Sequence, residues 1–307
     1  MKYSRTFLPP IGLSDRQLSL VLLLTTSLIW GTSFILIKKA VRVLGPLETG
    51  SLRISFAFLI FLPVVALQLR RIPRRLTGWV VISGLIGSLF PSLLFSWAGS
   101  RISSSLSGML NAVTPLFTVL IGALFLGERY PAMRWAGLIT GMAGTAGLAL
   151  SHGNGRSDWN LQVIPVVVAT LLYALNVNLI RHKLSGIPPL LLSGATVVAV
   201  GPLAMAILLG ATDFTALIRQ GGEVWQAAGY VAVLGFFGTA FALVLFNKLI
   251  QLSGTLTASS VTYIMPAISL AWGLGDGEPI GLLQVAGLAG ILTGVYLVNR
   301  KPEEKEK

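Results

Sequence analysis

The chain has 307 residues, of which 54% are hydrophobic and 11% are charged, and its mean hydropathy is +0.79. A soluble domain carries about 25% charged residues, so this composition indicates a membrane protein. The absence of cysteine, with His152 and His182 as the two histidines, excludes disulfides, thiolate ligands and an imidazole metal cluster. We therefore expect no metal and no cofactor. The net charge of +12 lies in short segments between apolar runs rather than on one polar surface, so no nucleic-acid partner is expected.

Apolar runs recur along the chain, and crossing a bilayer takes about 20 helical residues. Breaks such as Gly45-Pro46 and Gly186-Ile187-Pro188-Pro189 separate the runs. The sequence predicts an all-α integral membrane fold with ten transmembrane helices, at 18–37, 47–69, 79–99, 102–126, 132–150, 160–180, 188–210, 226–250, 255–275 and 280–299. The first run resembles a secretory signal, but Lys38-Lys39 close it without a small-residue cleavage site, so we expect it to be retained.

Lysine and arginine set the predicted orientation, because cytoplasmic segments retain positive charge. With the N-terminus inside, the outer segments carry Lys38, Lys39, Arg42, Arg101, Arg156 and Arg219, Arg53 lies within the second span, and the other 16 of the 23 basic residues are inside. Both termini are therefore expected to be cytoplasmic, in a bacterial-type inner membrane.

An internal repeat divides the chain. The segment from Gly127-Glu128 through Ala136-Gly137-Leu138 to Gly144 recurs 150 positions later, from Gly277-Glu278 through Ala286-Gly287-Leu288 to Gly294. Weaker matches at nearby offsets pair Pro115 with Pro266, Gly84 and Gly87 with Gly235 and Gly238, Phe90 with Phe241, Phe95 with Phe246, Trp30 with Tyr173 and Pro46 with Pro189. Chance matches are common among small residues in membrane helices, but these pairs keep one order.

The repeat predicts two five-helix halves, 18–150 and 151–299, between cytoplasmic tails 1–17 and 300–307. Because five is odd, the second half enters the bilayer from the opposite side. The halves are then inverted-topology repeats about a pseudo-two-fold axis in the membrane plane, an arrangement typical of transporters.

Several motifs occur in a familiar order: Trp30-Gly31-Thr32-Ser33, Arg53, Pro115 before Gly127-Glu128, and Pro266 before Gly277-Glu278. Over residues 18–299 the chain resembles the ten-helix EamA-like exporters of the drug/metabolite transporter superfamily. The resemblance implies a helical basket whose cavity is lined mainly by the first, third, fourth, sixth, eighth and ninth spans, and export of amino acids or other small metabolites. Tyr173-Ala174 stands where Trp30-Gly31 stands, so the two cavity walls need not contact substrate equally.

Polar groups in hydrocarbon are costly unless they are paired or face a wet cavity. Asn111, Thr114, Asn176, Asn178 and Asn247 are therefore candidates for substrate contacts, with interhelical hydrogen bonds of about 0.6 kcal/mol as the alternative. Aromatic rings at middle depth could stack on an organic substrate or simply pack. The candidate substrate-binding residues are Trp30, Ser33, Phe90, Asn111, Thr114, Tyr173, Asn176, Phe241 and Tyr263.

The two matched prolines and the charged residues near span ends are predicted to have structural roles. Pro115 and Pro266 are candidate hinges or static kinks. Arg53 is a candidate structural charge that snorkels outward, pairs with Glu48 or faces an anionic substrate group. Glu128 and Glu278 are expected to fix helix ends and turns.

The absence of mid-membrane Asp, Glu or His predicts uncoupled movement, or coupling through the substrate's own charge. The sequence thus predicts a transporter, active as a monomer among membrane lipids, that exports a small organic metabolite by alternating access. A multidrug or nucleotide-metabolite carrier of the same superfamily, or a channel, is the alternative. No enzyme is expected, because no carboxylate pair, Ser/His dyad or metal set is visible.

Overall fold

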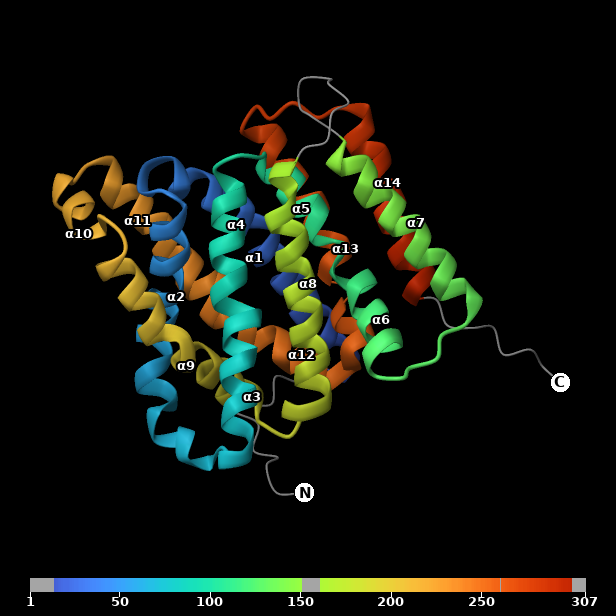
Figure 1. Cartoon of the computed structure of the whole chain (residues 1–307), viewed down its shortest axis with the longest axis horizontal. Coiled ribbons are helices and arrows are strands. Elements are labelled where there is room, and N and C mark those ends of the chain that lie inside the picture. The colour runs from blue at the N-terminus through green and yellow to red at the C-terminus, as the bar shows by residue number, and fades with distance from the viewer. Residues whose placement is uncertain (1–13, 151–160, 260, 300–307) are drawn as a thin grey trace.

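The computed structural model describes residues 14–150, 161–259 and 261–299, which are helical and contain no β-strand (Figure 1). The first half contains α1 (Asp15–Leu44), α2 (Pro46–Val65), η1 (Ala66–Arg71), α3 (Arg74–Gly84), η2 (Leu85–Leu89), α4 (Phe90–Gly99), α5 (Ser104–Asn111), α6 (Thr114–Phe125) and α7 (Ala132–Ala149). The second contains η3 (Leu161–Val163), α8 (Ile164–Leu179), η4 (Ile180–Leu184), α9 (Pro189–Gly210), α10 (Phe214–Leu217), η5 (Ile218–Gln220), α11 (Glu223–Val233), η6 (Leu234–Phe241), α12 (Ala242–Ser259), α13 (Val261–Gly275) and α14 (Leu282–Asn299).

The predicted all-α class is confirmed. Most of the predicted N-terminal tail, the whole C-terminal tail and residues 151–160 at the predicted boundary between the halves lie outside the described residues.

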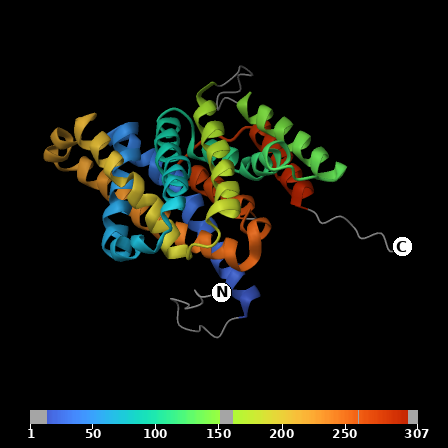
Figure 2. The ribbon, with the colours of Figure 1, turned by 60° about the horizontal axis from the view of Figure 1, so that its bottom comes forward.

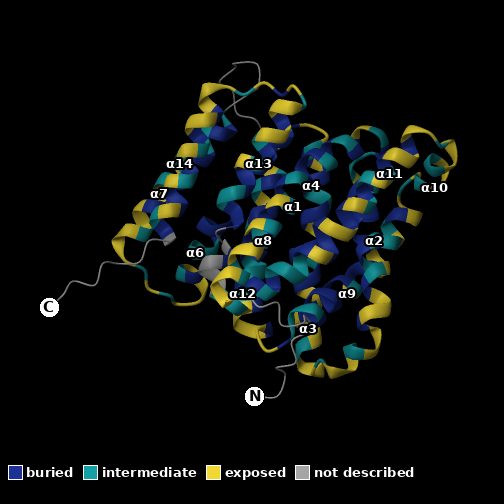
Figure 3. Ribbon diagram, turned by 180° about the vertical axis from the view of Figure 1, so that it is seen from behind, coloured by how far each residue is buried: buried dark blue, intermediate teal, exposed yellow. Residues whose placement is uncertain are grey.

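Within the described part of the chain, seven helices are long and apolar enough to cross a membrane, while Val261–Gly275 and Leu282–Val298 are apolar but shorter. The count of ten spans therefore stays a prediction. Large apolar side chains lie on the outside, with Phe125 76% exposed and Ile139 69% exposed, and exposed residues follow the outer sides of the helices along their length (Figure 3). Such a surface suits lipid rather than water, and the chain is a multi-pass membrane protein.

The first helix is longer than predicted. It begins at a capping box in which Ser14 Oγ accepts a hydrogen bond from Gln17 N and Gln17 Oε1 accepts one from Ser14 N. It continues beyond Lys38-Lys39 to Leu44. The predicted end at residue 37 was wrong because Lys38 is paired with carboxylates inside the protein and does not need to reach water.

Helices α7 and α14 pack against each other through glycines, and they stand as a pair beside the other helices in both views (Figures 1 and 2). A Cβ on Gly137 would lie 2.6 Å from the carbonyl oxygen of Gly294, and a Cβ on Gly144 would lie 2.6 Å from that of Gly287. In the other direction, a Cβ on Gly294 would lie 2.5 Å from the carbonyl oxygen of Gly137, and a Cβ on Gly287 would lie 2.9 Å from that of Gly144. The two helices are therefore antiparallel, in a reciprocal contact that only small residues permit.

The two matched prolines sit differently in their helices. Pro115 lies in the first turn of α6, after Ala112 and Val113 separate α5 from α6. Pro266 lies inside α13, which continues through it. The first half therefore has a helix break just after Asn111, whereas in the second half α13 continues through Pro266 as one helix. Whether either proline is a hinge stays a prediction.

Candidate functional site

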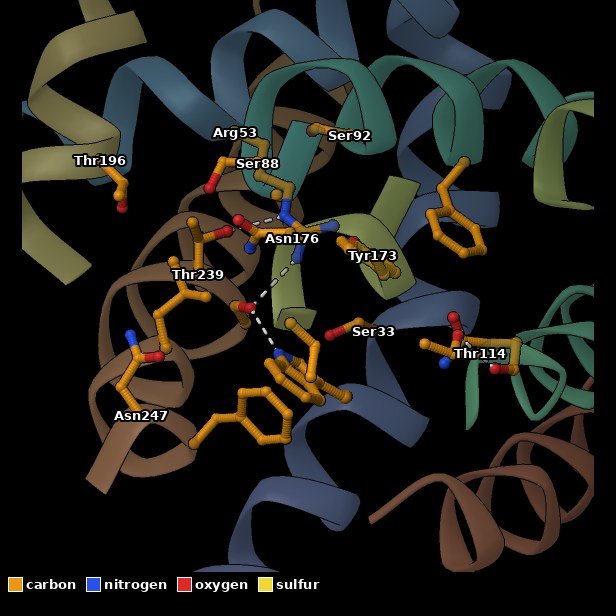
Figure 4. Close-up of a pocket in the computed structure, with 18 of the residues that line it drawn as sticks. Ser33, Arg53, Ser88, Ser92, Thr114, Tyr173, Asn176, Thr196, Thr239 and Asn247 are labelled. Atoms are coloured by element: carbon orange, nitrogen blue, oxygen red, sulfur yellow. Dashed lines mark hydrogen bonds between the residues drawn. The ribbon is translucent and has the colours of Figure 1, made fainter. Parts of the chain in front are cut away.

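A cavity of about 120 Å³ lies among helices from both halves (Figure 4). Its lining comes from Trp30, Ser33, Phe34, Ile37, Arg53, Ile54, Ser83, Gly87, Ser88, Ser92, Phe95, Asn111, Thr114, Tyr173, Asn176, Val177, Ile180, Leu192, Thr196, Gly238, Thr239, Leu243, Phe246, Asn247, Thr262 and Met265. A buried water needs only about 10–15 Å³ measured in this way, so the space admits several waters or a small organic molecule. Besides the spans that the resemblance implied, α2 and α9 contribute to the wall.

Most of the predicted binding residues meet at this cavity. It is lined by the candidates Trp30, Ser33, Asn111, Thr114, Tyr173 and Asn176, and also by Asn247. Tyr263 lies elsewhere, with its hydroxyl donating to the carbonyl of Val295. Asn178 bonds to the backbone oxygens of Thr118 and Ala174 and so joins helices. Phe90 and Phe241 are 43% and 42% exposed and lie outside the cavity lining.

Two aromatic pairs form parts of the wall, and each joins the two halves of the chain. Trp30 of α1 meets Phe246 of α12 with ring centroids 4.9 Å apart. Phe95 of α4 stacks on Tyr173 of α8 at 5.9 Å. Trp30 and Tyr173 are matched in the sequence repeat, as are Phe95 and Phe246, so the second pair is the first with the halves exchanged.

Both halves also have a π-helical segment beside the cavity, η2 in the first and η6 in the second. A π-helical turn interrupts the regular α-helical hydrogen bonds and is frequent at functional sites. In η6 the carbonyl oxygen of Gly238 accepts hydrogen bonds from Trp30 Nε1 at 3.0 Å and from Arg53 Nη2 at 3.1 Å (Figure 4). This carbonyl therefore ties two side chains of the first half to the second.

Short polar side chains complete the wall. Ser83 donates to Asn176 Oδ1 at 2.6 Å, and Asn247 Nδ2 donates to Ser193 Oγ at 2.8 Å. Asn111 Oδ1 is buried without a hydrogen-bond partner in the described residues. Sequence reasoning missed the hydroxyl residues Ser83, Ser88, Ser92, Thr196, Thr239 and Thr262. Serine and threonine are routine in helices, where they often bond to their own backbone, so they gave no signal.

A buried ion-pair cluster lies where α1 approaches the turn between α13 and α14. Lys38 Nζ is 2.7 Å from Asp276 Oδ2 and 2.6 Å from Glu278 Oε1. The Glu278 carboxylate also accepts hydrogen bonds from the backbone N–H groups of Ser104 and Ser105, at 2.8 and 2.9 Å. Glu278 therefore fixes the start of α5, a helix distant in sequence, through the N-terminal N–H groups that lack intrahelical partners.

The matched Glu128 makes a looser cluster near the end of α8. Its Oε1 is 3.0 Å from Arg181 Nη1, whose side chain is 48% exposed, and its Oε2 accepts a hydrogen bond from the Tyr130 hydroxyl. Burial, and then the hydrogen bond and charge of Glu128, raise the pKa of Tyr130 to about 12. Each glutamate follows a glycine with positive φ, 67° at Gly127 and 74° at Gly277. Glycine adopts this conformation without steric cost and ends a helix there.

Glu278 makes stability depend on pH. Burial opposes its ionisation, but the hydrogen bonds from Lys38, Ser105 and Ser104 outweigh this and lower its pKa from 4.5 to about 2. The unfolded chain therefore binds the proton first, so the stabilisation is complete above about pH 5 and is lost as the pH falls toward 2. A pKa difference of this size corresponds to about 3 kcal/mol.

Unfolding of the detergent-solubilised protein, followed between pH 7 and pH 3, measures this effect. Glu278→Gln is expected to have a flatter stability profile than the wild type below pH 5. Parallel profiles for the two proteins would show that Glu278 does not cause the loss.

The family comparison agrees with this architecture. The model of the EamA-like transporter family matches residues 17–150 and again residues 160–300. An uncharacterized transporter of Archaeoglobus fulgidus is 26% identical over 282 residues, covering 92% of this chain and 98% of that protein. The uncharacterized inner membrane transporter YedA of Escherichia coli is 25% identical over 281 residues, covering 89% and 87%.

A further relative has a name that mentions a substrate, and a solved structure shares the fold. A probable terminal-alkyne amino-acid exporter of Streptantibioticus cattleyicolor is 26% identical over 288 residues, covering 91% of this chain and 92% of the relative. One protein crystal structure, 17% identical in sequence, superposes with a TM-score of 0.62 over 91% of this chain and 95% of that one. At that identity the likeness concerns the fold alone.

The family match covers both halves, and these relatives are named transporters rather than enzymes. The resemblance predicted from Trp30, Arg53 and the two Gly-Glu motifs is confirmed. The chain belongs to the EamA-like transporter family of membrane transporters, with one family domain in each half.

Proposed function

We propose that this transporter exports a small organic metabolite, an amino acid or a related zwitterionic or aromatic compound, by alternating access through the central cavity. The Streptantibioticus relative named as a probable amino-acid exporter supports the substrate class, as do the aromatic and neutral polar groups of the cavity wall. We place the chain in a bacterial-type inner membrane, in line with the name of YedA, with ten spans, both termini cytoplasmic, and a functional monomer.

The proposal includes an inverted repeat. Under the sequence alignment of the halves, Gly137 corresponds to Gly287 and Gly144 to Gly294, so the contact of Gly137 with Gly294 becomes that of Gly144 with Gly287. Such an exchange is the property of an interface on a two-fold axis. The two aromatic pairs at the cavity exchange in the same way. In an inverted repeat, exchange of the two halves' conformations moves the opening of a central site from one side to the other.

The observation that carries alternating access is the difference between the two matched ion-pair clusters. The turn between α13 and α14 and that between α6 and α7 lie at opposite ends of the molecule (Figure 1). At the first turn the Lys38 side chain is 11% exposed and Glu278 is 3% exposed; at the second, Arg181 is 48% and Glu128 is 22% exposed. The matched glutamates and their basic partners are thus packed tightly at one end and loosely at the other, as expected when one end is closed. With the predicted orientation, the closed end faces outward.

Transport in proteoliposomes tests the proposal. Purified protein is reconstituted, and flux is measured for a panel of amino acids, nucleosides and cationic drugs against protein-free liposomes. We expect saturable flux of at least one amino acid or related compound. Linear, non-saturating flux would favour the channel alternative, preference for the cationic drugs would favour a multidrug carrier, and no flux of any compound through correctly folded protein would contradict the proposal.

A further inference from the structure

Arg53 is a buried cation in the wall of the cavity. It lies in α2, is 9% exposed, and faces the space shared with Thr239, Asn176 and Tyr173 (Figure 4). Within the described residues no carboxylate forms an ion pair with it, and the cavity lining contains no Asp or Glu. It neither snorkels to an interface nor pairs with Glu48. An uncompensated charge at this depth is costly, so its position calls for an anionic partner.

The hydrogen bonds of Arg53 hold its guanidinium in place and leave one side of it available. Nε donates to Thr239 Oγ1 at 2.8 Å, and Nη2 donates to the Gly238 carbonyl at 3.1 Å. Nη1 makes no hydrogen bond to any described residue. Guanidinium donors are arranged in a rigid plane that suits the two oxygens of a carboxylate, and a group already held by two bonds loses little freedom when an anion binds.

The cation also breaks the correspondence between the two halves. A Cβ on Gly235 would lie 3.1 Å from the carbonyl oxygen of Arg53, and the matched Gly84 approaches the carbonyl oxygen of Thr196 in the same way. Thr196 is therefore the counterpart of Arg53, and both line the cavity. Each half contributes one ring to each aromatic pair, but only the first half contributes the positive charge. The site therefore distinguishes the two ends of a substrate.

We propose, on the basis of the function proposed above, that the cavity selects substrates bearing a carboxylate, which binds at Arg53, on an apolar or aromatic body. That body packs against the two aromatic pairs, Trp30 with Phe246 and Phe95 with Tyr173. The class comprises small aromatic and aliphatic carboxylic acids, with amino acids as its zwitterionic members. A neutral amide of the same shape cannot neutralise the guanidinium, so it binds more weakly.

Matched acid and amide probes test this selectivity. Equilibrium dialysis of the detergent-purified full chain measures binding of 3-phenylpropanoate, L-phenylalanine and butanoate at pH 7, each competed by its own primary amide. The wild type is expected to bind at least one of the acids about tenfold or more tightly than its amide, as for a charged hydrogen bond. Equal binding within every pair, or no binding of any acid, overturns the proposal.

Variants locate the selectivity. Arg53→Gln is expected to abolish the preference for the acid and Arg53→Lys to retain part of it. Arg101→Gln, which removes an exposed cation stacked on Trp97, is the matched control and should retain all of it. A preference that survives in Arg53→Gln overturns the assignment, and if that variant does not fold, the wild-type comparison still decides. If the protein transports neutral or cationic compounds and shows no preference for acids, the proposed transport function holds and the carboxylate site is wrong. If it binds acids preferentially but transports nothing, the carboxylate site holds and the proposed transport function is wrong.

Discussion

Replacing Lys38 with methionine is expected to lower the free energy of unfolding by about 3–5 kcal/mol, because it leaves the buried Glu278 carboxylate without its cation. The matched change Arg181→Met should cost less than about 1 kcal/mol, since that pair is half-exposed and screened by solvent. The side chains are 11% and 48% exposed, respectively. Unfolding of both variants in detergent, at neutral pH, measures the difference. Equal losses would contradict the view that the two clusters are in different states.

The same pair of variants reports on closure of the outer end. Because the chain has no cysteine, Ser33→Cys places a single thiol in the cavity wall. In right-side-out vesicles, Lys38→Met is expected to increase the rate at which a membrane-impermeant maleimide labels this thiol, while Arg181→Met should not increase it. Fast labelling of the wild type that Lys38→Met does not increase would mean that the closed end faces the cytoplasm.

The positions of the helices could be predicted because they depend on local features. Apolar runs, the glycine and proline breaks and the two Gly-Glu motifs indicate most of the helix limits, and the structure has helices over most of the predicted ranges. The predicted break at 251–254 was wrong, because α12 continues through it to Ser259. The end of α1 was wrong for a non-local reason. A lysine after an apolar run usually marks the end of a membrane span, and Lys38 was interpreted in that way. Its partners Asp276 and Glu278 lie more than 200 positions later in the sequence and pair with its charge inside the protein.

The direction in which side chains face was harder to predict than their depth. Phe90 and Phe241 were predicted at suitable depths, but Phe90 directly follows the π-helical segment η2 and Phe241 is the last residue of the π-helical segment η6. One residue of an α-helix corresponds to about 100° of rotation, so the extra residue in a π-helical turn rotates the side chains after it to another face of the helix. Both rings are exposed on the outside. Arg53 was uncertain for a related reason, because its partners in η6 are brought to it by the packing of the two halves.

Replacing Gly144 with alanine is expected to destabilise the protein by about 1–3 kcal/mol, the usual cost of adding atoms to a fully packed contact. The new Cβ would lie 2.6 Å from both the carbonyl oxygen of Gly287 and the backbone nitrogen of Ile291. These are backbone atoms, so neither can rotate away and the helices must separate. Elsewhere in a helix, glycine to alanine is favourable by about 0.5–1 kcal/mol.

Gly147, three residues further along α7, provides the matched control. A Cβ there would find only the Cα of Gly287 within reach, at 3.8 Å, an ordinary van der Waals contact. Gly147→Ala should therefore be neutral or stabilising, so the two substitutions should have opposite signs in the same unfolding measurement. Since Gly144 and Gly294 are matched positions at the proposed axis, Gly294→Ala should lose as much stability as Gly144→Ala. A loss confined to one of them would show that the α7 and α14 contact is not reciprocal, and the inverted repeat would lose its strongest support.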